Sequence, residues 1–394
     1  MLPRLVLHSA VARYRRPESV VCYWSGSELI AFNYLSRVRT PAPLFAVDVL
    51  SYCEHWRTID EIKTRFACPP GPLKRLLRIL SQRTLLDRHA GNRPPMHHSL
   101  AAWEPWMPEA AVFHFGTKDV KYGSQQEMDD LLVRKAASRP PPAPVKAYST
   151  AQRRTLPPAR PSDLARVLFE RRTWRKFGAQ QVSIGDVGTL LGHTFGVQQW
   201  AETRVGLCAL KTSPSGGARH PIEAYLLARR VAGLPRGCYY YDPDGHELAL
   251  IKSGLTAQRL EAYLSGQTCY RDVPAVVVMT AVFKRSQWRY EFARAYRVVL
   301  LDAGHLCQTF LLVATSLGLA PFCTAALADS LLEHDLQIDG VNESVIYACG
   351  VGARPPSLEW APWPDTSEVP RRVPPRSANK PDIEDLGTEP RGEK

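Results

Sequence analysis

A short run of cationic side chains with a hydroxyl among them offers a site for a phosphate group. Arg171, Arg172, Thr173 and Arg175 lie close together at the end of a predicted helix. Guanidinium groups bind phosphate oxygens in pairs, and a hydroxyl adds a short donor. Basic residues are also common at helix ends, where they face the negative end of the helix dipole. Alone, the run therefore does not establish a ligand.

A second candidate site is the loop Pro214-Ser215-Gly216-Gly217, followed by Arg219 and then by a predicted strand. Two glycines let the backbone approach a flat ligand that a Cβ atom would block. Ser215 and Arg219 add a donor and a cation beside that approach. The alternative is an ordinary turn with a solvated arginine. The spacing matches neither G-x-x-x-x-G-K-[ST] nor G-x-G-x-x-G, which excludes the common nucleotide loops.

These motifs lie among well-patterned elements. Hydrophobic spacing predicts helices at 164–172, 184–192 and 296–317. Strands are predicted at 223–228, 237–242, 274–283 and 344–351. The helix at 296–317 is nearly hydrophobic all round, which predicts a place in the centre of a domain. Because helices and strands mix without strict βαβ alternation, the fold class predicted is α+β.

The N-terminal part resembles a small helical module over residues 44–88. Thr58 and Glu61 form a predicted capping box, and a third helix and a short strand follow. Three helices followed by strands are typical of a winged helix. Lys74, Arg75 and Arg78 lie on the third helix, where a DNA-binding protein would place its base contacts. A solvated helix face is the favoured interpretation of these charges.

Composition divides the chain into four parts. Residues 1–100 hold the winged-helix-like N-terminal module. Residues 101–160 hold an aromatic segment, expected to pack on a neighbouring surface, and a proline-rich linker. Residues 161–355 hold the α+β domain. Residues 356–394 form a tail rich in proline and charge, expected to be disordered.

The whole-chain composition limits the functional classes. The net charge of +12 fits either nucleic acid or an anionic cofactor with an acidic peptide partner. None of the nine cysteines forms a C-x-x-C pair, so neither a disulfide framework nor a metal site is expected. No stretch approaches the ~20 apolar residues of a membrane span. Without a signal peptide, a cytoplasmic protein is expected.

Together the two motifs resemble the flavin-binding signature of the nitroreductase superfamily. R-R-x-x-R-x-F at 171–177 precedes P-S-G-G-A-R-x-P at 214–221. They are more closely similar to the SagB-type branch, the FMN-dependent azoline dehydrogenases of thiazole/oxazole-modified peptide biosynthesis. The run 237–243, followed by His246-Glu247-Leu248, matches that branch's strand pair, and 301–305 matches the start of its central helix. The resemblance covers residues 161–354.

The resemblance implies roles for individual residues. In the family the first motif holds the FMN phosphate and pyrimidine edge, and the second lies along the flavin ring. This nominates Arg171, Arg172, Thr173 and Arg175, and then Pro214, Ser215, Gly216, Gly217 and Arg219. Ala325 and Ala326 stand where the family has a glycine pair facing the reactive side of the ring. Arg354 is a further phosphate candidate, with a solvated strand-end arginine as the alternative.

The family also carries a Lys-Tyr pair before the central helix, where this chain has Trp288-Arg289-Tyr290. Aromatising an azoline transfers a hydride to the flavin and requires a base for the proton. Arginine stays protonated, so Tyr290 is the predicted proton acceptor, with Arg289 stabilising an anion or lowering the pKa of Tyr290. Two residues packing at a helix entrance are the alternative. His305 is expected to be a buried core residue, and His220 stands beside the glycine loop.

The function that this resemblance implies is FMN-dependent oxidation of azoline rings, or of a related site, on a ribosomally made or carrier-bound peptide. A homodimer with FMN at its interface is expected, with a cyclodehydratase as a further partner and an N-terminal module that grips the leader of a precursor peptide. The arginine in place of lysine leaves open another two-electron oxidation. The alternatives are a flavin oxidoreductase acting on a small metabolite and a flavin-sensing DNA-binding regulator, for which salt-sensitive DNA binding would be required.

Overall fold

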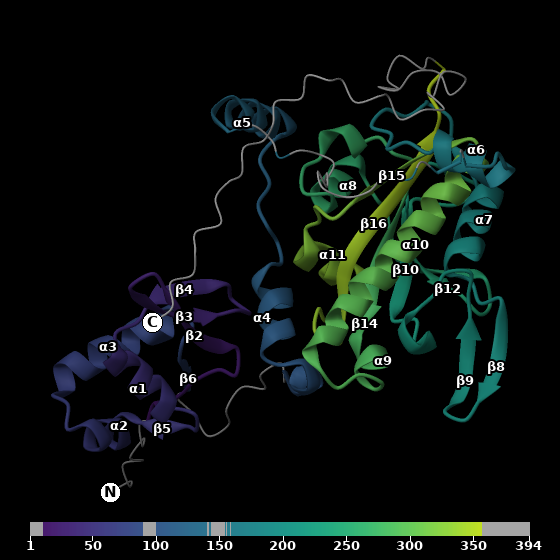
Figure 1. The fold of residues 1–394 in the computed structure, drawn as a ribbon. Coiled ribbons are helices and arrows are strands. Elements are labelled where there is room, and N and C mark those ends of the chain that lie inside the picture. The colour runs from purple at the N-terminus through teal and green to yellow at the C-terminus, as the bar shows by residue number, and fades with distance from the viewer. Residues whose placement is uncertain are drawn as a thin grey trace, which may run out of the picture.

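The computed structural model describes residues 11–89, 100–139, 142, 154, 156, 157 and 159–356. A six-stranded sheet forms its largest part (Figure 1), with neighbouring strands in the order β13-β12-β10-β14-β16-β15. Every neighbouring pair in it is antiparallel. The strands are β10 (Ile222–Ala228), β12 (Gly237–Asp242), β13 (Glu247–Ser253), β14 (Ala275–Val282), β15 (Leu319–Thr324) and β16 (Glu343–Ala353).

The central strands are apolar throughout because both faces of the sheet are covered. In β14, Val277 and Met279 enter one hydrophobic core, whereas Val276 and Val278 enter the other. Successive side chains of a strand point to opposite faces, so a strand covered on both sides needs an unbroken apolar run. The run Val276-Val277-Val278 therefore signalled a buried strand correctly.

Helices form the two outer layers. The helices α7 (Ile184–Phe195) and α10 (Tyr296–Ser316) pack together and contribute to one core. The helices α8 (Ala257–Tyr263) and α11 (Asp329–Leu336) contribute to the other. The short helix α6 (Asp163–Glu170) contacts α10 (Figure 1). This mixed helix-and-sheet architecture confirms the predicted fold class.

Two expectations about α10 are wrong. Leu300 and Leu301 are 40% and 60% exposed, so the helix is not buried all round. The stretch Ala293–Ser316 is also long and apolar enough, by length and composition, to cross a membrane. Half of this apolar stretch is buried inside the protein, against the sheet. The helix therefore lies as a core helix with one uncovered face.

The N-terminal module contains α1 (Leu44–Tyr52), α2 (Ile59–Phe66) and α3 (Pro70–Gln82). A small sheet joins β1 (Arg13–Arg15), β5 (Arg57–Thr58) and β6 (Asp87–His89). A second sheet, not anticipated, joins β2 (Val20–Ser25), β3 (Glu28–Asn33) and β4 (Val38–Pro41). The Thr58–Glu61 capping box is present. The winged-helix assignment stays a prediction.

The segment after this module packs into the sheet domain. The turn η1 (Leu100–Trp106) and the helix α4 (Glu109–Gly116) place Trp103 and Trp106 in the main core, fully buried. Trp103 Nε1 donates to the Val341 carbonyl at 2.8 Å, and Phe115 stacks on Tyr34 of the N-terminal module. Residues 100–116 therefore join the N-terminal module to the sheet domain. Figure 1 shows α4 between these two parts.

Several helices were not predicted, among them α4, α8 and α11. The helix α5 (Gln125–Ser138) lies in a stretch expected to be mostly connection, and Ser124 and Glu127 form its capping box. The proline-rich run that follows lies mostly outside the described residues, as does the tail from residue 357.

Replacing Trp103 with Ala should lower the free energy of unfolding by about 3–5 kcal/mol, because a fully buried indole and its hydrogen bond are lost. Trp24→Ala is the matched control, since that indole is 65% exposed and its loss should change stability by no more than about 0.5 kcal/mol. Urea unfolding followed by circular dichroism measures both. Equal effects of the two substitutions would contradict the packing role.

Candidate functional site

The carboxylate of Asp302 is the group of α10 that binds the glycine loop at two points. The loop lies between β9 (Gly206–Leu210) and β10. Ser215 Oγ donates to Asp302 Oδ2 at 2.5 Å, and the Gly216 amide donates to Asp302 Oδ1 at 3.2 Å. The His220 amide donates to Ser215 Oγ at 2.9 Å, which closes the loop. Burial raises the pKa of Asp302, and the two hydrogen bonds from the loop oppose that shift.

The loop has no room for side chains at its two glycines. A Cβ on Gly216 would overlap Val298 of α10, and one on Gly217 would overlap the Arg289 side chain. Gly217 also has φ +61, the left-handed region that favours glycine. The backbone of this loop therefore lies directly against Arg289, and a Cβ on Gly217 would stand 3.0 Å from Tyr290 Oη. Two motifs that are far apart in the sequence meet here.

The Arg289–Tyr290 pair follows α9 (Phe283–Gln287). Arg289 Nε donates to Tyr290 Oη at 3.3 Å, and the guanidinium carbon lies 5.6 Å from the tyrosine ring centroid. The Tyr290 amide donates to Ser286, and its carbonyl accepts from Trp106 Nε1 at 2.9 Å. Tyr290 is partly buried, whereas Arg289 is exposed. The backbone of Tyr290 is thus held from two sides.

The cationic run lies beyond the end of α6, which closes at Glu170 rather than at the predicted residue 172. Arg171 and Arg172 are partly buried, and Thr173 and Arg175 are exposed. The Trp174 amide donates to the Pro321 carbonyl at 2.9 Å. This bond ties the run to the edge strand β15.

Arg354 belongs to the same end of the domain. Its Nη2 and Nε donate to the carbonyls of Thr315 and Leu319, each at 3.1 Å, and its guanidinium lies 5.9 Å from the ring of Trp174. The solvated strand-end alternative is therefore wrong, because this side chain binds one carbonyl in the last turn of α10 and one at the start of β15. A cation there also faces the negative end of the helix dipole.

Ala325 and Ala326 follow β15 directly. Ala325 is exposed, and the Ala326 carbonyl accepts from Gln267 Nε2 at 3.1 Å. The Ala326 amide donates to Thr324 Oγ1 at 3.1 Å. Both backbone groups of Ala326 thus have partners inside the chain.

The expected cofactor residues do not converge in one chain. Asp302 holds the glycine loop, whereas the Thr315 carbonyl holds Arg354, and these positions are ~20 Å apart along α10 at the usual helical rise. In the sheet, β15 and β10 are separated by β16 and β14, so roughly 14 Å divides the strands beside the cationic run and the glycine loop.

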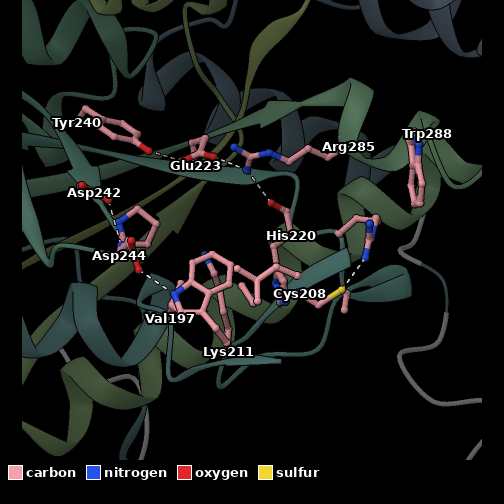
Figure 2. Close-up of a pocket in the computed structure, with 16 residues that line it drawn as sticks. Val197, Cys208, Lys211, His220, Glu223, Tyr240, Asp242, Asp244, Arg285 and Trp288 are labelled. Carbon is pink, nitrogen blue, oxygen red and sulfur yellow. Dashed lines mark hydrogen bonds and ion pairs between the residues drawn. The ribbon is translucent and has the colours of Figure 1, made fainter. Parts of the chain in front are cut away.

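A pocket of about 430 Å³ opens beside the glycine loop (Figure 2). Ala218, Arg219 and His220 belong both to its lining and to the loop region. Side chains from distant segments complete it: Val197, Trp200, Leu207, Cys208, Ala209, Lys211, Glu223, Tyr240, Asp242, Pro243, Asp244, Arg285 and Trp288. Sequence reasoning missed Lys211, Glu223 and Arg285, because no local motif marks them. Part of the wall comes from an unanticipated hairpin, β8 (Gln199–Thr203) with β9.

The two histidines differ from each other. His305 is exposed on α10, so the expectation of a buried core residue is wrong. Burial, followed by the positive charge of Lys211, lowers the pKa of His220 to about 4. Among the residues that the structure describes, no group of three or more His, Cys, Asp or Glu side chains could hold a metal ion.

Asp302→Ala should destabilise the protein by about 1–3 kcal/mol, because a hydroxyl and a backbone amide lose their acceptor. Ser215→Ala removes the hydroxyl side of the same contact. The double variant should therefore unfold with a smaller cost than the sum of the two single variants. Denaturant unfolding of all four proteins measures the coupling, and strictly additive costs would show that the two side chains act independently.

The chain was compared with known proteins. The family model described as "Nitroreductase family" matches residues 168–353. A nitroreductase of Methanocaldococcus jannaschii, MJ1384, is 30% identical over 183 residues, which are 46% of this chain and 88% of that protein. The trifolitoxin-processing protein TfxB of Rhizobium leguminosarum bv. trifolii is 31% identical over 270 residues, 64% of this chain and 70% of the relative.

Among solved structures, a chain of the Escherichia coli microcin synthetase McbBCD complex, with truncated pro-MccB17 bound, is 21% identical with a TM-score of 0.40. The match covers 58% of this chain and 91% of that chain. The family model spans the domain that carries the glycine loop and the cationic run. The chain therefore belongs to the nitroreductase family of oxidoreductases, as the resemblance to its SagB-type branch predicted.

Proposed function

We propose that this oxidoreductase uses FMN to oxidise an azoline ring, or a related site, on a ribosomally made or carrier-bound peptide. The observation that carries the proposal is the contact between the glycine loop and the Arg289–Tyr290 pair. The backbone at Gly216 and Gly217 thereby lies next to the phenol of Tyr290, which is able to accept a proton. The relative TfxB, a trifolitoxin-processing protein, supports action on a biosynthetic precursor rather than on a free metabolite.

The residues present fit FMN. Gly216 and Gly217 give the loop a stretch of backbone without side chains of its own, which allows the close approach of a flat ring. Arg171, Arg172, Thr173 and Arg175 form one phosphate site, which suits a mononucleotide. When bound, FMN supplies the two-electron acceptor. Pro214, Ser215 and Arg219 would contact FMN together with the two glycines. Ala325, Ala326 and Arg354 would contact it together with the cationic run.

The distance between these groups favours a site shared by two copies of the chain. A ribityl chain spans only ~9 Å between phosphate and ring at ordinary bond lengths, which is less than the separation along α10. In a homodimer the cationic run of one protomer would meet the glycine loop of its partner. The exposed apolar residues Leu300 and Leu301 of α10 offer a surface for such a contact.

Tyr290 then accepts the proton that leaves the substrate carbon. Its backbone is fixed by Trp106 and Ser286, so its position does not depend on the substrate. Arg289 Nε donates to the phenol oxygen, so the guanidinium lies beside the atom that takes up the proton. Replacing the family's lysine with arginine leaves this charge in place while removing a second base.

The remaining parts receive roles by the same reasoning. The N-terminal module grips the leader of the precursor peptide, and a cyclodehydratase supplies the azoline. Aromatic packing of Phe115 on Tyr34 holds this module against the sheet domain, as a fixed grip on one substrate would require.

The purified protein should be yellow and release about one FMN per chain. Arg171→Ala with Arg175→Ala should bleach it, because two charge-assisted phosphate contacts of about 1.5–3 kcal/mol each are lost. Together they correspond to a dissociation constant weaker by roughly two to four orders of magnitude. Absorbance of the flavin after gel filtration measures the result. An FMN-replete double variant at micromolar protein would remove these residues from the site.

A mixed dimer tests whether the site is shared. The bleached double variant, co-expressed with Gly217→Val, should form heterodimers with one intact site and half the FMN of the parent dimer. The intact site combines the cationic run of one protomer with the loop of the other. If both groups acted within one chain, the heterodimer would recover no flavin.

Tyr290→Phe should keep FMN and fold but lose substrate oxidation by roughly a hundredfold or more, the usual scale of a general base. Single-turnover reduction of the flavin by the substrate measures the chemical step. Arg289→Lys is the companion variant: if Arg289 acts by charge alone, activity persists, whereas loss shows that its planar group orients the substrate. Oxidation by Tyr290→Phe at the parental rate would place the proton acceptor elsewhere.

A further inference from the structure

The pocket beside the glycine loop contains acidic and basic side chains, but its inner acid is already neutralised. Glu223 is buried and forms an ion pair with Arg285, and Tyr240 Oη donates to its Oε2 at 3.0 Å (Figure 2). The Arg285 Nη1 also donates to the His220 carbonyl at 2.9 Å. Glu223 therefore leaves little negative charge for the other cations of the pocket.

Two of those cations have no acidic hydrogen-bond partner. Arg219 donates to the Gly217 carbonyl and to Cys208 Sγ, and its guanidinium lies 5.1 Å from the ring of Trp288. The Lys211 ammonium has neither a hydrogen bond nor an ion pair with any residue that the structure describes. Burial lowers the pKa of Lys211, which Glu223 opposes and Arg285 reinforces. Both charges thus lack a compensating anion in contact.

The same three cations also act on His220. Beyond burial, its pKa is lowered by Lys211, Arg219 and Arg285, which all disfavour a further cation. At neutral pH its ring is therefore uncharged. The remaining acids have hydrogen-bond donors of their own: Asp242 accepts from the Asp244 amide at 3.0 Å, and Asp244, which is exposed to solvent, accepts from Trp200 Nε1 at 2.9 Å.

We propose that this pocket binds a carboxylate of the substrate, held by Lys211 together with Arg219. The carboxylate is an acidic side chain or a peptide C-terminus close to the residue being oxidised. That the ligand is a peptide rests on the proposed function. The charge argument does not, because it depends only on the pocket.

The position of the pocket gives this carboxylate a role in specificity. Ala218, Arg219 and His220 adjoin both the pocket and the loop that faces the ring. A peptide anchored here by one residue therefore places a neighbouring residue at Tyr290, which is the positioning that a redox step requires. A volume of about 430 Å³ falls in the range of small-molecule clefts and admits one side chain with part of its backbone.

Binding should be coupled to protonation. A carboxylate beside Lys211 raises the pKa of that ammonium, so binding takes up a proton wherever the free protein has partly lost it. Affinity then falls as pH rises through the lysine pKa. Several charged or titratable groups share a cavity lining with Lys211. They are Glu223 from β10, Arg285 from α9, Arg219 and His220 from the loop region, Asp302 from α10, Asp242 at the end of β12 and Asp244 after it.

The test is calorimetric binding to the full-length, FMN-loaded protein. The probes are N-acetyl-glutamate N-methylamide and its glutamine counterpart, and N-acetyl-glycylglycine and its C-terminal amide. At least one acid should bind tenfold or more tightly than its amide, and the better acid identifies a side chain or a C-terminus as the source. Repeating the titration in two buffers with different ionisation enthalpies measures the proton uptake.

Three variants make the test specific. Lys211→Met should weaken binding of the acid at least tenfold and leave the amide unchanged. Lys211→Arg should keep the affinity but lose the proton uptake, because arginine stays protonated. Lys284→Met is the matched control: that lysine is exposed on α9 and does not line the pocket, so acid binding should be unchanged.

Two results would overturn the proposal: equal binding of both acids and their amides up to millimolar probe, or parental binding of the acid by Lys211→Met. Failure of the proposed function gives a different pattern. Loss of FMN or of peptide oxidation would be read from flavin absorbance and turnover, whereas the preference for acid over amide requires neither.

Discussion

The hydrogen bonds from the glycine loop to the carboxylate of Asp302 are the contact on which the rest of the site depends. Asp302 is buried on α10, and α10 is fixed by packing on the sheet. Through Ser215 and Gly216, the carboxylate fixes the position of the two glycines, which have no side chains of their own to pack. The backbone at Gly217 can then lie against Arg289, and the pocket can form on the other side of the loop.

Much of the sheet domain could be predicted from the sequence, because each signal was local. An unbroken apolar run marked β14, and Ser162 marked the start of α6, where its side chain accepts from the Ala165 amide. Some features were missed because their local signal was weak, and others because they depend on long-range packing. The helix α5 had the same kind of capping signal but lay among prolines and charges, and its exposed surface gave no clear apolar stripe. Likewise, the exposed face of α10 has an apolar composition that cannot be told from a buried one until the neighbours are known.

The residue types of the site could be predicted from the sequence, but their arrangement in space could not. The glycine loop and the Arg289–Tyr290 pair were identified separately, and only the fold brings them into contact. The cationic run was assigned to the same ligand, yet the fold places it at the other end of α10. Lys211 gave no signal at all, because an isolated lysine acquires an unusual environment only when a hairpin, a strand and a helix from distant parts of the chain surround it.

The burial of Trp103 and Trp106 defines which parts of this chain can be exchanged as units. Residues 100–116 lie before the proline-rich run, yet their indoles fill the core beneath the sheet, and one of them donates to the backbone of Tyr290. A chimera joined within the proline-rich run would carry a foreign segment into that core and remove a support of Tyr290. Recombination among relatives is expected to keep this segment with the sheet domain, so that new N-terminal modules are acquired by crossovers upstream of Leu100 rather than in the linker.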